Sequence, residues 1–506
     1  MIKYFDTRAF LAESLPFRDV ILEGIAPGGG LFVPERVPKL TQAEILTLGA
    51  MPYWQRAATV YGRFELGLPD ETIARITRGA YGANFDHADV AALREVGGDR
   101  YVLELWHGPT LAFKDMALQC MPLFFSEALD HAAAEGRPES DRLILVATSG
   151  DTGVAALAGY ADVPHVKIAV CYPKGGVSAV QQRQMTTQLG GNLTVFEVEG
   201  DFDACQRSVK AVFADEAFAQ ELMAGHGLRL SSANSINWGR LLPQIVYYLS
   251  GYADMVARGV CAPGQPIDIC VPSGNFGNIL AAYYAKGMGL PVGRLICASN
   301  DNHVLPDFFS SGVYDISSRL LVKTASPSMD ILVSSNLERL LFELRRDGAW
   351  VRDLMQGLST SGVFRLDATS FDLVERDFVA DWVDTATSLK TIGAVFTEHG
   401  YLMDPHTAVG WEVARRLSGD NPMLVISTAH WSKFPADVYR GLQGLEPDVP
   451  VDRDEIALVD TVEKLAPGNP APSMVRDMAG RPVRFDNPVG AGAEPLEKAI
   501  VGWLSA

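Results

Sequence analysis

The sequence has no apolar run long enough to cross a membrane. Its longest stretch without a charged residue, 269–285, is interrupted by Pro272, two glycines and two asparagines, whereas a spanning helix needs about 20 predominantly apolar residues. Charged side chains also occur within the first eight positions, where a secretory segment needs an unbroken apolar stretch. We therefore expect a cytoplasmic protein with no membrane partner.

Paired cysteines and positive charge are also scarce. The six cysteines contain no Cys-x-x-Cys spacing, so free thiols in a reducing compartment fit better than disulfides or a structural zinc site. Lys and Arg total 43 against 61 Asp and Glu, a formal net charge of −18. A nucleic-acid binder needs clustered cations to neutralise phosphates. We therefore expect no nucleic-acid partner.

Short aliphatic runs are the main structural signal in the sequence. The chain has 506 residues, 48% of them hydrophobic, enough for more than one core. Four runs have strand length and β-branched content: 143–147, 166–170, 267–271 and 423–426. Each is followed by small or polar residues and then a helical pattern, which predicts parallel sheets with helices on both faces. Ligands bind beyond the carboxyl ends of such strands.

Lys114 lies in the most informative of these segments, 104–115. The pattern predicts a strand that ends at Leu105, a Gly-Pro turn, and a helix from Met116 to Ala134, which Pro122 would kink or delay. A lysine near a helix N-terminus is biased toward its neutral form, the form that makes a Schiff base. The alternative is an ordinary solvated lysine at a helix start.

Two glycine-containing loops that follow predicted strands are candidate anion sites. The first, 148–153, presents hydroxyls and backbone N–H groups, and the second, 273–278, allows close backbone approach. The second loop matches neither the dinucleotide-binding glycine pattern nor the P-loop, so one phosphate monoester suits it better than a pyrophosphate. A capped turn and a plain tight turn remain the alternatives.

Two further segments contain candidate binding groups. Asn234 and Ser235 precede Arg240, a residue suited to bidentate recognition of phosphate or carboxylate. Alternatively, the first two cap a helix over 241–249 and Arg240 is exposed. Thr428 follows a predicted buried strand and could hydrogen-bond a ring nitrogen of a cofactor, while nearby His430 is interpreted as structural rather than catalytic because no partner carboxylate is identifiable.

Taken together and in this order, these segments resemble threonine synthase, a pyridoxal-phosphate enzyme family of the tryptophan-synthase-β fold. Further matching segments are 24–34, 326–331, 335–339 and 404–408, so the resemblance covers nearly the whole chain. The length and the Ser-Pro-Ser-Met-Asp-Ile stretch resemble the longer fungal and proteobacterial branch. The early Asp6-Thr7-Arg8-Ala9 departs from the family pattern, and we assign no site there.

The resemblance implies an α/β protein with two open, mainly parallel three-layer α/β domains (PLP fold type II) and a smaller amino-terminal domain. It divides the chain into an amino-terminal domain (1–95), a large cofactor-binding domain (96–135 and 235–506, with a helical insert at about 326–390) and a small domain (136–234) with the substrate loop. A monomer or homodimer is expected.

The resemblance also implies roles for individual residues. Lys114 would form the Schiff base with pyridoxal 5′-phosphate, Thr428 would face the pyridine nitrogen, and Asp151 would lie near the 3′-oxygen, where some relatives have Asn. An aspartate there adds negative charge beside a phenolate, which leaves its hydrogen bonding and protonation open. Cofactor contacts are implied for Lys114, Phe113, Asp151, Ser273, Gly274, Asn275, Phe276, Gly277, Asn278 and Thr428. Substrate contacts are implied for Thr148, Ser149, Thr152, Asn234, Ser235 and Arg240, with no metal.

The implied reaction converts O-phospho-L-homoserine and water to L-threonine and phosphate, the last step of threonine biosynthesis. Three alternatives remain at this stage. A threonine-synthase-like phospho-lyase would eliminate phosphate without hydration, and a catalytically silent paralogue would keep only the fold, although the intact Lys114 argues against it. A serine/threonine dehydratase would need no phosphate-recognition cluster.

Overall fold

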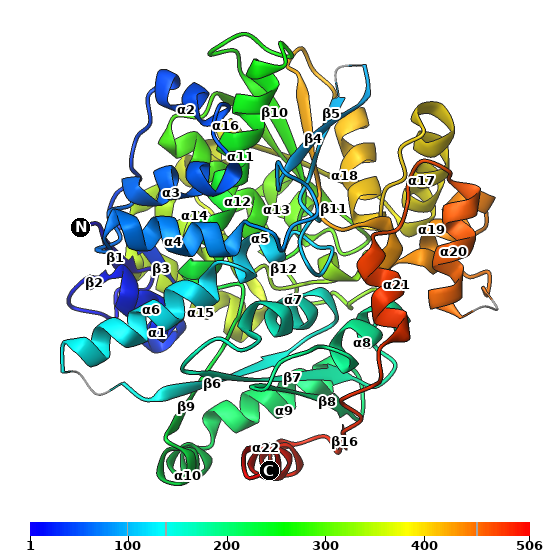
Figure 1. Ribbon diagram of the computed structural model, residues 1–506. Helices are drawn as coiled ribbons and strands as arrows, with labels where there is room; N and C mark the ends of the chain where they lie inside the picture. The colour runs from blue at the N-terminus through cyan, green and yellow to red at the C-terminus, as the bar shows by residue number, and fades with distance from the viewer. Residues whose placement is uncertain (99, 137–138, 452–453) are drawn as a thin grey trace.

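Two β-sheets organise the computed structural model, which describes residues 1–98, 100–136, 139–451 and 454–506 (Figure 1). The larger sheet has the strand order β14-β11-β10-β15-β5-β4. Its strands are β4 (Ala92–Gly97), β5 (Arg100–Glu104), β10 (Ile267–Pro272), β11 (Val292–Ser299), β14 (Phe378–Trp382) and β15 (Met423–Ser427). All neighbours are parallel except β4 and β5. The strands predicted at 267–271 and 423–426 are confirmed as β10 and β15.

The smaller sheet is wholly parallel, in the order β16-β8-β7-β6-β9. Its strands are β6 (Asp141–Ala147), β7 (Val166–Pro173), β8 (Leu193–Val198), β9 (Leu228–Ser231) and β16 (Pro488–Val489). Successive side chains of a strand point to opposite faces. Leu143 and Leu145 accordingly join the core under α9 (Phe202–Ala214), whereas Ile144 and Val146 join the core under α7 (Asp151–Tyr160). This sheet therefore has helices on both faces (Figure 1).

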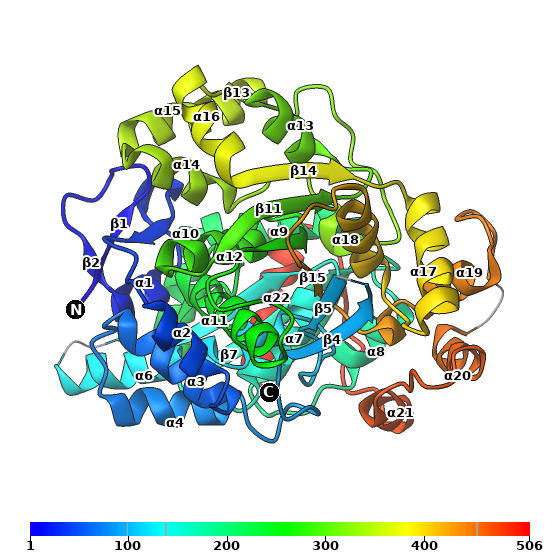
Figure 2. The same ribbon diagram turned by 90° about the horizontal axis from the view of Figure 1, so that it is seen from above.

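The larger sheet is also the middle of three layers. Leu103, Ile269 and Leu424 belong to the core that includes α11 (Trp238–Ala257) and α12 (Gly277–Met288). Their sequence neighbours Val102, Cys270 and Val425, which point to the opposite face, belong to the core that includes α18 (Pro405–Arg416). Figure 2 shows α11 and α12 on one side of the strands and α18 on the other. The predicted fold class, mainly parallel three-layer α/β sheets with an amino-terminal unit, is confirmed.

The amino-terminal unit joins a small antiparallel sheet to a layer of helices. Strands β1 (Lys3–Asp6), β2 (Leu15–Pro16) and β3 (Phe32–Pro34) form the sheet. The helices are α1 (Phe17–Glu23), α2 (Gln42–Leu48), α3 (Tyr53–Arg63) and α4 (Asp70–Ala80), and a 3-10 turn, η1, covers Pro27–Gly29. Trp238 at the start of α11 packs against Tyr4 and Phe64 at ring distances of 5.5 and 6.2 Å, so this unit rests on the helix layer of the larger sheet.

The segment after Lys114 is split into two helices. Helix α5 covers Asp115–Leu118 and α6 covers Met121–Ala134, so the single helix predicted from Met116 to Ala134 is wrong. Pro122 lies in the first turn of α6, where its missing N–H has no intrahelical partner to lose. Of the two effects considered for Pro122, the later start is the one observed.

Three segments lie differently from the predicted domain limits. The stretch 326–390 contains helices, but β13 (Val363–Arg365) pairs with β12 (Val313–Asp315) and β14 joins the larger sheet. Residues 488–504, expected in the large domain, return to the smaller sheet as β16 and α22 (Ala493–Leu504), and β4 begins within the range given to the amino-terminal domain. The helices of 326–390 are η2 (Pro327–Met329), α14 (Leu337–Arg345), α15 (Gly348–Ser361), α16 (Ala368–Asp377) and the first part of α17 (Thr385–His399).

The remaining helices flank the two sheets. They are α8 (Ala179–Thr186), α10 (Glu216–His226), α13 (Val304–Ser311), η3 (Trp431–Lys433), α19 (Pro435–Gln443), α20 (Glu455–Leu465) and α21 (Ser473–Gly480). Both α20 and α21 pack against α8, so the carboxyl-terminal segment joins the two α/β units before it ends at the smaller sheet. Among the described residues, no helix combines the length and the apolarity needed to cross a membrane.

Candidate active site

The loops after β5 and β15 bring Lys114 and Thr428 together. These strands are parallel neighbours, and the pairing continues past their ends: Phe113 N donates to Thr428 O at 2.8 Å, and Ala112 bridges Ala429. The Thr428 side chain is buried, and its hydroxyl makes no hydrogen bond with a described residue. A hydroxyl is thus available beside the lysine segment.

The Lys114 amine has a lowered pKa. Its Nζ donates to Ser328 Oγ at 3.3 Å. Burial lowers the pKa of Lys114 to about 8; Asp151 opposes this shift, and Arg240 and Lys433 add to it. The pKa of Lys114 is therefore lowered, in the predicted direction. The cause differs from the predicted helix N-terminus: α5 spans only four residues, and burial and neighbouring cations lower the pKa instead. A substantial neutral fraction exists at physiological pH.

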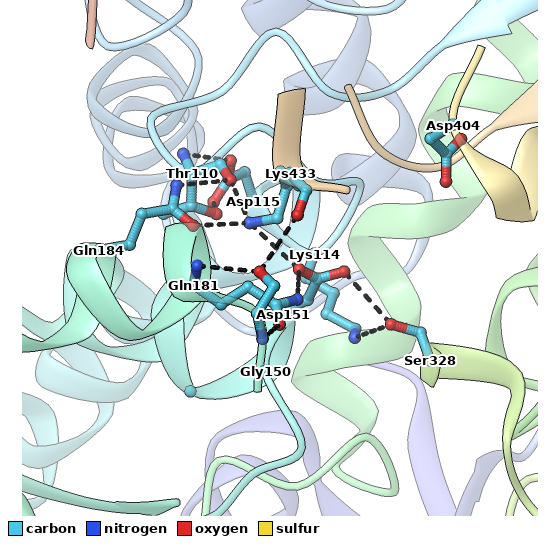
Figure 3. Close-up of polar contacts among 12 residues, drawn as sticks. Thr110, Lys114, Asp115, Gly150, Asp151, Gln181, Gln184, Ser328, Asp404 and Lys433 are labelled. Atoms are coloured by element: carbon cyan, nitrogen blue, oxygen red, sulfur yellow. Dashed lines mark hydrogen bonds and ion pairs between the residues drawn. The ribbon is translucent and has the colours of Figure 1, made fainter. Parts of the chain in front are cut away.

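Asp151, at the start of α7, is held as an ionised carboxylate. Its Oδ1 accepts from Gln181 Nε2 at 2.8 Å and pairs with Lys433 Nζ at 3.1 Å, while its Oδ2 accepts from Ser328 Oγ at 3.2 Å (Figure 3). Burial alone raises the pKa of Asp151, but Lys433 and then Lys114 lower it far below the usual range. Asp151 is therefore a carboxylate in the cofactor-free protein.

Lys433 is the most important residue that sequence reasoning missed. It is fully buried, and its Nζ also donates to Thr110 O at 2.7 Å and to Gln184 Oε1 at 2.9 Å. The residue lies within the segment 427–434 that supports the family resemblance, yet received no role. The available signal was its sequence position: a lysine close after a buried strand in a segment with few other charges.

Ser328 was also missed as a site residue. It lies in the Ser-Pro-Ser-Met-Asp-Ile segment, and its backbone N donates to His406 Nε2 at 3.2 Å. The other ring nitrogen, His406 Nδ1, lies 2.6 Å from Asp404 Oδ2, which fixes the ring. Sequence segments 326–331 and 404–408, used only for the resemblance, thus meet beside Lys114.

Some polar groups of the loop after β6 form hydrogen bonds within the loop. Thr148 Oγ1 accepts from Gly150 N at 3.0 Å and from Gly153 N at 2.9 Å, so this hydroxyl holds the turn. Gly150 has φ +139°, and an added Cβ would lie 2.5 Å from the Gln181 carboxamide. The half-buried hydroxyls of Ser149 and Thr152 have no hydrogen-bond partner among the described residues, and they remain free for a ligand.

The loop after β10 has donors without partners at its helix end. Phe276 (φ +63°) precedes α12 without a side-chain cap, and the backbone N–H groups of Gly277 and Asn278 donate to no described residue. The buried Nδ2 of Asn278 also lacks a partner, while Tyr247 and Tyr248 donate to its Oδ1. Free N–H groups at a helix N-terminus favour an anion, and a phosphate site at this loop stays a prediction.

The backbone of the same loop packs closely against a neighbouring segment of the chain. A Cβ on Gly274 would lie 2.9 Å from Ser328 O, and one on Gly277 would lie 3.3 Å from Asn336 Nδ2. Asn275 O accepts from Asn336 N at 3.1 Å, and Ser273 Oγ donates to Val271 O at 2.9 Å. The backbone of this loop is therefore held against the 328–336 segment.

Arg240 is buried without an acidic partner in the described part of the chain. Its Nη1 donates to Ala233 O at 2.7 Å, and its Nε has no partner. Burial lowers the pKa of Arg240 to about 10, and Tyr160 opposes the shift. A buried, unpaired guanidinium is suited to a bound anion. The alternative of a solvent-exposed Arg240 is wrong.

Asn234 and Ser235 lie before α11 rather than at its cap. Asn237 caps the helix by accepting from Gly239 N at 2.9 Å, so capping by the two predicted residues is also wrong. Asn234 is exposed and, together with Arg8 and Glu338, lines a cavity of about 590 Å³ that neither Lys114 nor Arg240 lines. No cluster of His, Cys, Asp and Glu in the described ranges suits a metal ion.

The donor set fits pyridoxal phosphate. Lys114 offers an amine with a pKa of about 8. The α12 N-terminus and Asn278 offer unpaired donors for a phosphate, and Thr428 offers a free hydroxyl. With the mainly parallel sheets, this site defines a pyridoxal-phosphate-dependent enzyme of fold type II. The model of the family "Pyridoxal-phosphate dependent enzyme" matches residues 88–429. Models for "Threonine synthase N terminus" and "Threonine synthase, C-terminal" match 3–81 and 407–487.

Relatives agree with these family models. The threonine synthase of Pseudomonas aeruginosa is 42% identical, covering 89% of this chain and 92% of its own. The PLP-bound threonine synthase structure from Brucella melitensis superposes with a TM-score of 0.86 at 38% identity, covering 100% of both chains. Human "Threonine synthase-like 1" is 42% identical over 84% of this chain, which spans only 58% of that protein's length. The chain belongs to the threonine synthase family.

Proposed function

We propose that this chain converts O-phospho-L-homoserine and water to L-threonine and phosphate. The observation that supports this most is the Lys114 amine with its pKa lowered to about 8, together with Arg240, a buried cation that acts on it electrostatically and has no acidic partner among the described residues. An amine suits cofactor chemistry at the amino group of a substrate, and an unpaired guanidinium suits a phosphate ester. The relatives named threonine synthase support the same reaction. This is the last step of threonine biosynthesis.

The proposed cofactor contacts come from three loops. Lys114 would hold pyridoxal phosphate covalently, with Phe113 beside it, and Thr428 would face the ring nitrogen. The phosphate would lie against the start of α12, at Ser273, Gly274, Asn275, Phe276, Gly277 and Asn278. Asp151 would lie near the 3′-oxygen. When bound, pyridoxal phosphate stores electrons released at the substrate's α-carbon.

The chain's own residues then bind the substrate and move protons. Lys114, once freed by the substrate amine, takes and returns protons at Cα and Cβ, because an amine with a pKa of about 8 is a suitable general base. Arg240, with Asn234 and Ser235, binds the phosphate that leaves from Cγ. Hydroxyls of the 148–152 loop (Thr148, Ser149 and Thr152) complete the substrate site, with Thr148 acting through the loop turn.

A second candidate activity is phosphate elimination without hydration. The similarity to proteins named threonine synthase-like 1 favours keeping it. The two activities share Lys114 and Arg240 and differ in product, L-threonine on one side and 2-oxobutanoate with ammonia on the other. Product analysis after turnover of phosphohomoserine separates them.

The decisive experiment combines an absorbance spectrum with a phosphate assay. The purified protein is expected to show a visible cofactor band and to release phosphate and L-threonine from phosphohomoserine. Lys114→Ala should lose both the band due to covalent attachment and turnover, because the variant lacks the amine that would form the Schiff base. Wild-type protein with neither a band nor phosphate release would contradict the proposal, and homoserine is the control substrate that lacks the phosphate.

The cellular setting is proposed on compositional grounds. All six cysteines are buried and unpaired, which supports a reducing compartment such as the cytoplasm. The net charge of −18 argues against a nucleic-acid partner. A monomer or homodimer and the three-domain division stay predictions, testable by sedimentation and by limited proteolysis.

A further inference from the structure

Two lysines, the buried Lys433 and the half-buried Lys114, lie near one carboxylate beside the proposed cofactor site. Lys433 Nζ lies 3.1 Å from Asp151 Oδ1. Lys114 Nζ reaches the other oxygen only through Ser328, by hydrogen bonds of 3.3 and 3.2 Å. The two lysines thus differ in how directly each is paired with the negative charge (Figure 3).

Lys433 has two hydrogen bonds and one ion pair. Its Nζ donates to Thr110 O at 2.7 Å and to Gln184 Oε1 at 2.9 Å. The same Nζ forms an ion pair with Asp151 Oδ1 at 3.1 Å. The buried carboxylate thus has a counter-ion in direct contact.

Lys114 has no comparable set of acceptors. Its single hydrogen bond to a described residue is the one to the Ser328 hydroxyl. Deprotonation of Lys114 therefore costs one weak hydrogen bond and leaves the ion pair between Lys433 and Asp151 intact.

We propose that Lys433 is a positioning residue that serves as the counter-ion of Asp151 and thereby leaves the Lys114 amine free to react. Without Lys433, the buried carboxylate would draw on Lys114 as its remaining nearby lysine and hold that amine protonated. The inference rests on the proposed function only in taking Lys114 as the cofactor lysine. It assigns a role to a buried residue that touches neither cofactor nor substrate in the proposed mechanism.

The same contacts give Lys433 a place between the two sheets. Thr110 lies in the turn after β5 of the larger sheet, whereas Gln184 in α8 and Asp151 in α7 belong to the smaller-sheet unit. Ser178 Oγ in the α8 cap also donates to Lys433 O at 3.1 Å. The counter-ion therefore holds its carboxylate in place relative to the lysine segment.

The neighbouring charges agree with the direction of the expected effect. Lys433 is the foremost of the charges that lower the pKa of Asp151, ahead of Lys114, and it lowers the pKa of Lys114 as well. Its removal would therefore raise the pKa of Lys114 by withdrawing repulsion and freeing the carboxylate. The titratable and charged groups facing the cluster are Lys114, Asp115, Asp151, Arg240, His406 and His430.

The test measures the reactivity of Lys114 in the full chain freed of cofactor. Trace acetic anhydride labels each lysine in proportion to its neutral fraction, peptide mass spectrometry isolates Lys114, and the exposed Lys498 is the internal reference. Wild type should reach half-maximal labelling near pH 8. Lys433→Met should move this midpoint upward by about one pH unit or more, because an unshared buried carboxylate then faces Lys114.

Two matched variants separate charge from structure. Lys433→Arg keeps the charge and should stay near the wild-type midpoint. The double variant Lys433→Met with Asp151→Asn removes both charges and should return the midpoint to the wild-type value or below, which repair of a purely structural defect would not do. If Lys433→Met does not fold, Lys433→Gln, which can still donate to Asp151 but has no charge, should show the same upward shift.

An unchanged or lowered midpoint in Lys433→Met or Lys433→Gln overturns the inference, as does a double variant whose midpoint stays raised. In the holoenzyme, the pH midpoint of the visible absorbance should shift in the same direction. Labelling requires neither cofactor nor phosphohomoserine. An absent shift in an active enzyme therefore counts against the inference alone, and an inactive wild type with the shift counts against the proposed function alone.

Discussion

Two groups of buried polar side chains in the candidate site differ in how completely they are paired. Lys433 Nζ donates to Thr110 O and Gln184 Oε1 and forms an ion pair with Asp151, so the charge of Asp151 has its counter-ion. Around Arg240 and the start of α12, the Nε of Arg240, the Nδ2 of Asn278 and the first helical N–H groups have no described partner. Unpaired buried donors destabilise a folded chain unless a ligand meets them. The first group is therefore internally paired, and the second has donors available for the anions proposed above.

Replacing Arg240 should give the largest effect and separates the two groups most clearly. Arg240→Met removes the unpaired cation, so kcat/KM for phosphohomoserine should fall by about 1,000-fold. The free energy of unfolding should stay equal or rise, because an uncompensated buried charge is lost. Phosphate release and urea unfolding measure the two quantities.

Arg339 provides the matched control. It is equally buried, but its guanidinium donates to Phe32 O, Asn336 Oδ1 and Ile236 O. Arg339→Met should lower the free energy of unfolding by about 3 kcal/mol, because three buried acceptors lose a charged donor. A destabilised Arg240→Met protein with normal turnover would show that Arg240 is structural and that the comparison is wrong.

The sheet framework could be predicted where strands are buried on both faces. The runs 143–147 and 166–170 became β6 and β7 because continuous aliphatic segments suit the centre of a parallel sheet. The edge strands β14 and β16 were missed. Their residues are only partly buried, so neither a continuous apolar run nor a regular alternation marks them.

The candidate site could be predicted only where one residue type suggests one chemistry. Lys114 and Arg240 stand out because a reactive amine and an anion-binding guanidinium follow strand-and-turn signals. Lys433, Gln181 and Ser328 do not, since their roles arise from contacts between distant parts of the chain: Lys114 and Ser328 are 214 positions apart. Such pairing is set by tertiary packing and leaves no local pattern.

The pH dependence of stability sharpens the contrast between Lys114 and its paired neighbours. The folded pKa of Lys114, about 8, lies below its unfolded value of about 10.4. Between these values the unfolded chain binds more protons, so stability rises with pH. Relative to Lys114→Met, cofactor-free wild type should gain about 3 kcal/mol from pH 8 to 10.5. Urea unfolding across this range measures the difference, and parallel curves would contradict it.

The smallest expected effect concerns the loop after β10, where alanine substitutions at two glycines should destabilise the protein to different extents. Gly274→Ala places a Cβ against the backbone of Ser328 and Met329 at 2.9 and 3.0 Å, whereas Gly277→Ala meets only the Asn336 side chain at 3.3 Å. Backbone must shift in the first case, which should destabilise the protein by about 1–2 kcal/mol and weaken cofactor binding. Because that shift also moves Ser328 away from Lys114, Gly274→Ala should disturb the paired group as well. Cofactor titration and thermal unfolding compare the variants, and equal effects would mean that close backbone approach does not shape this loop.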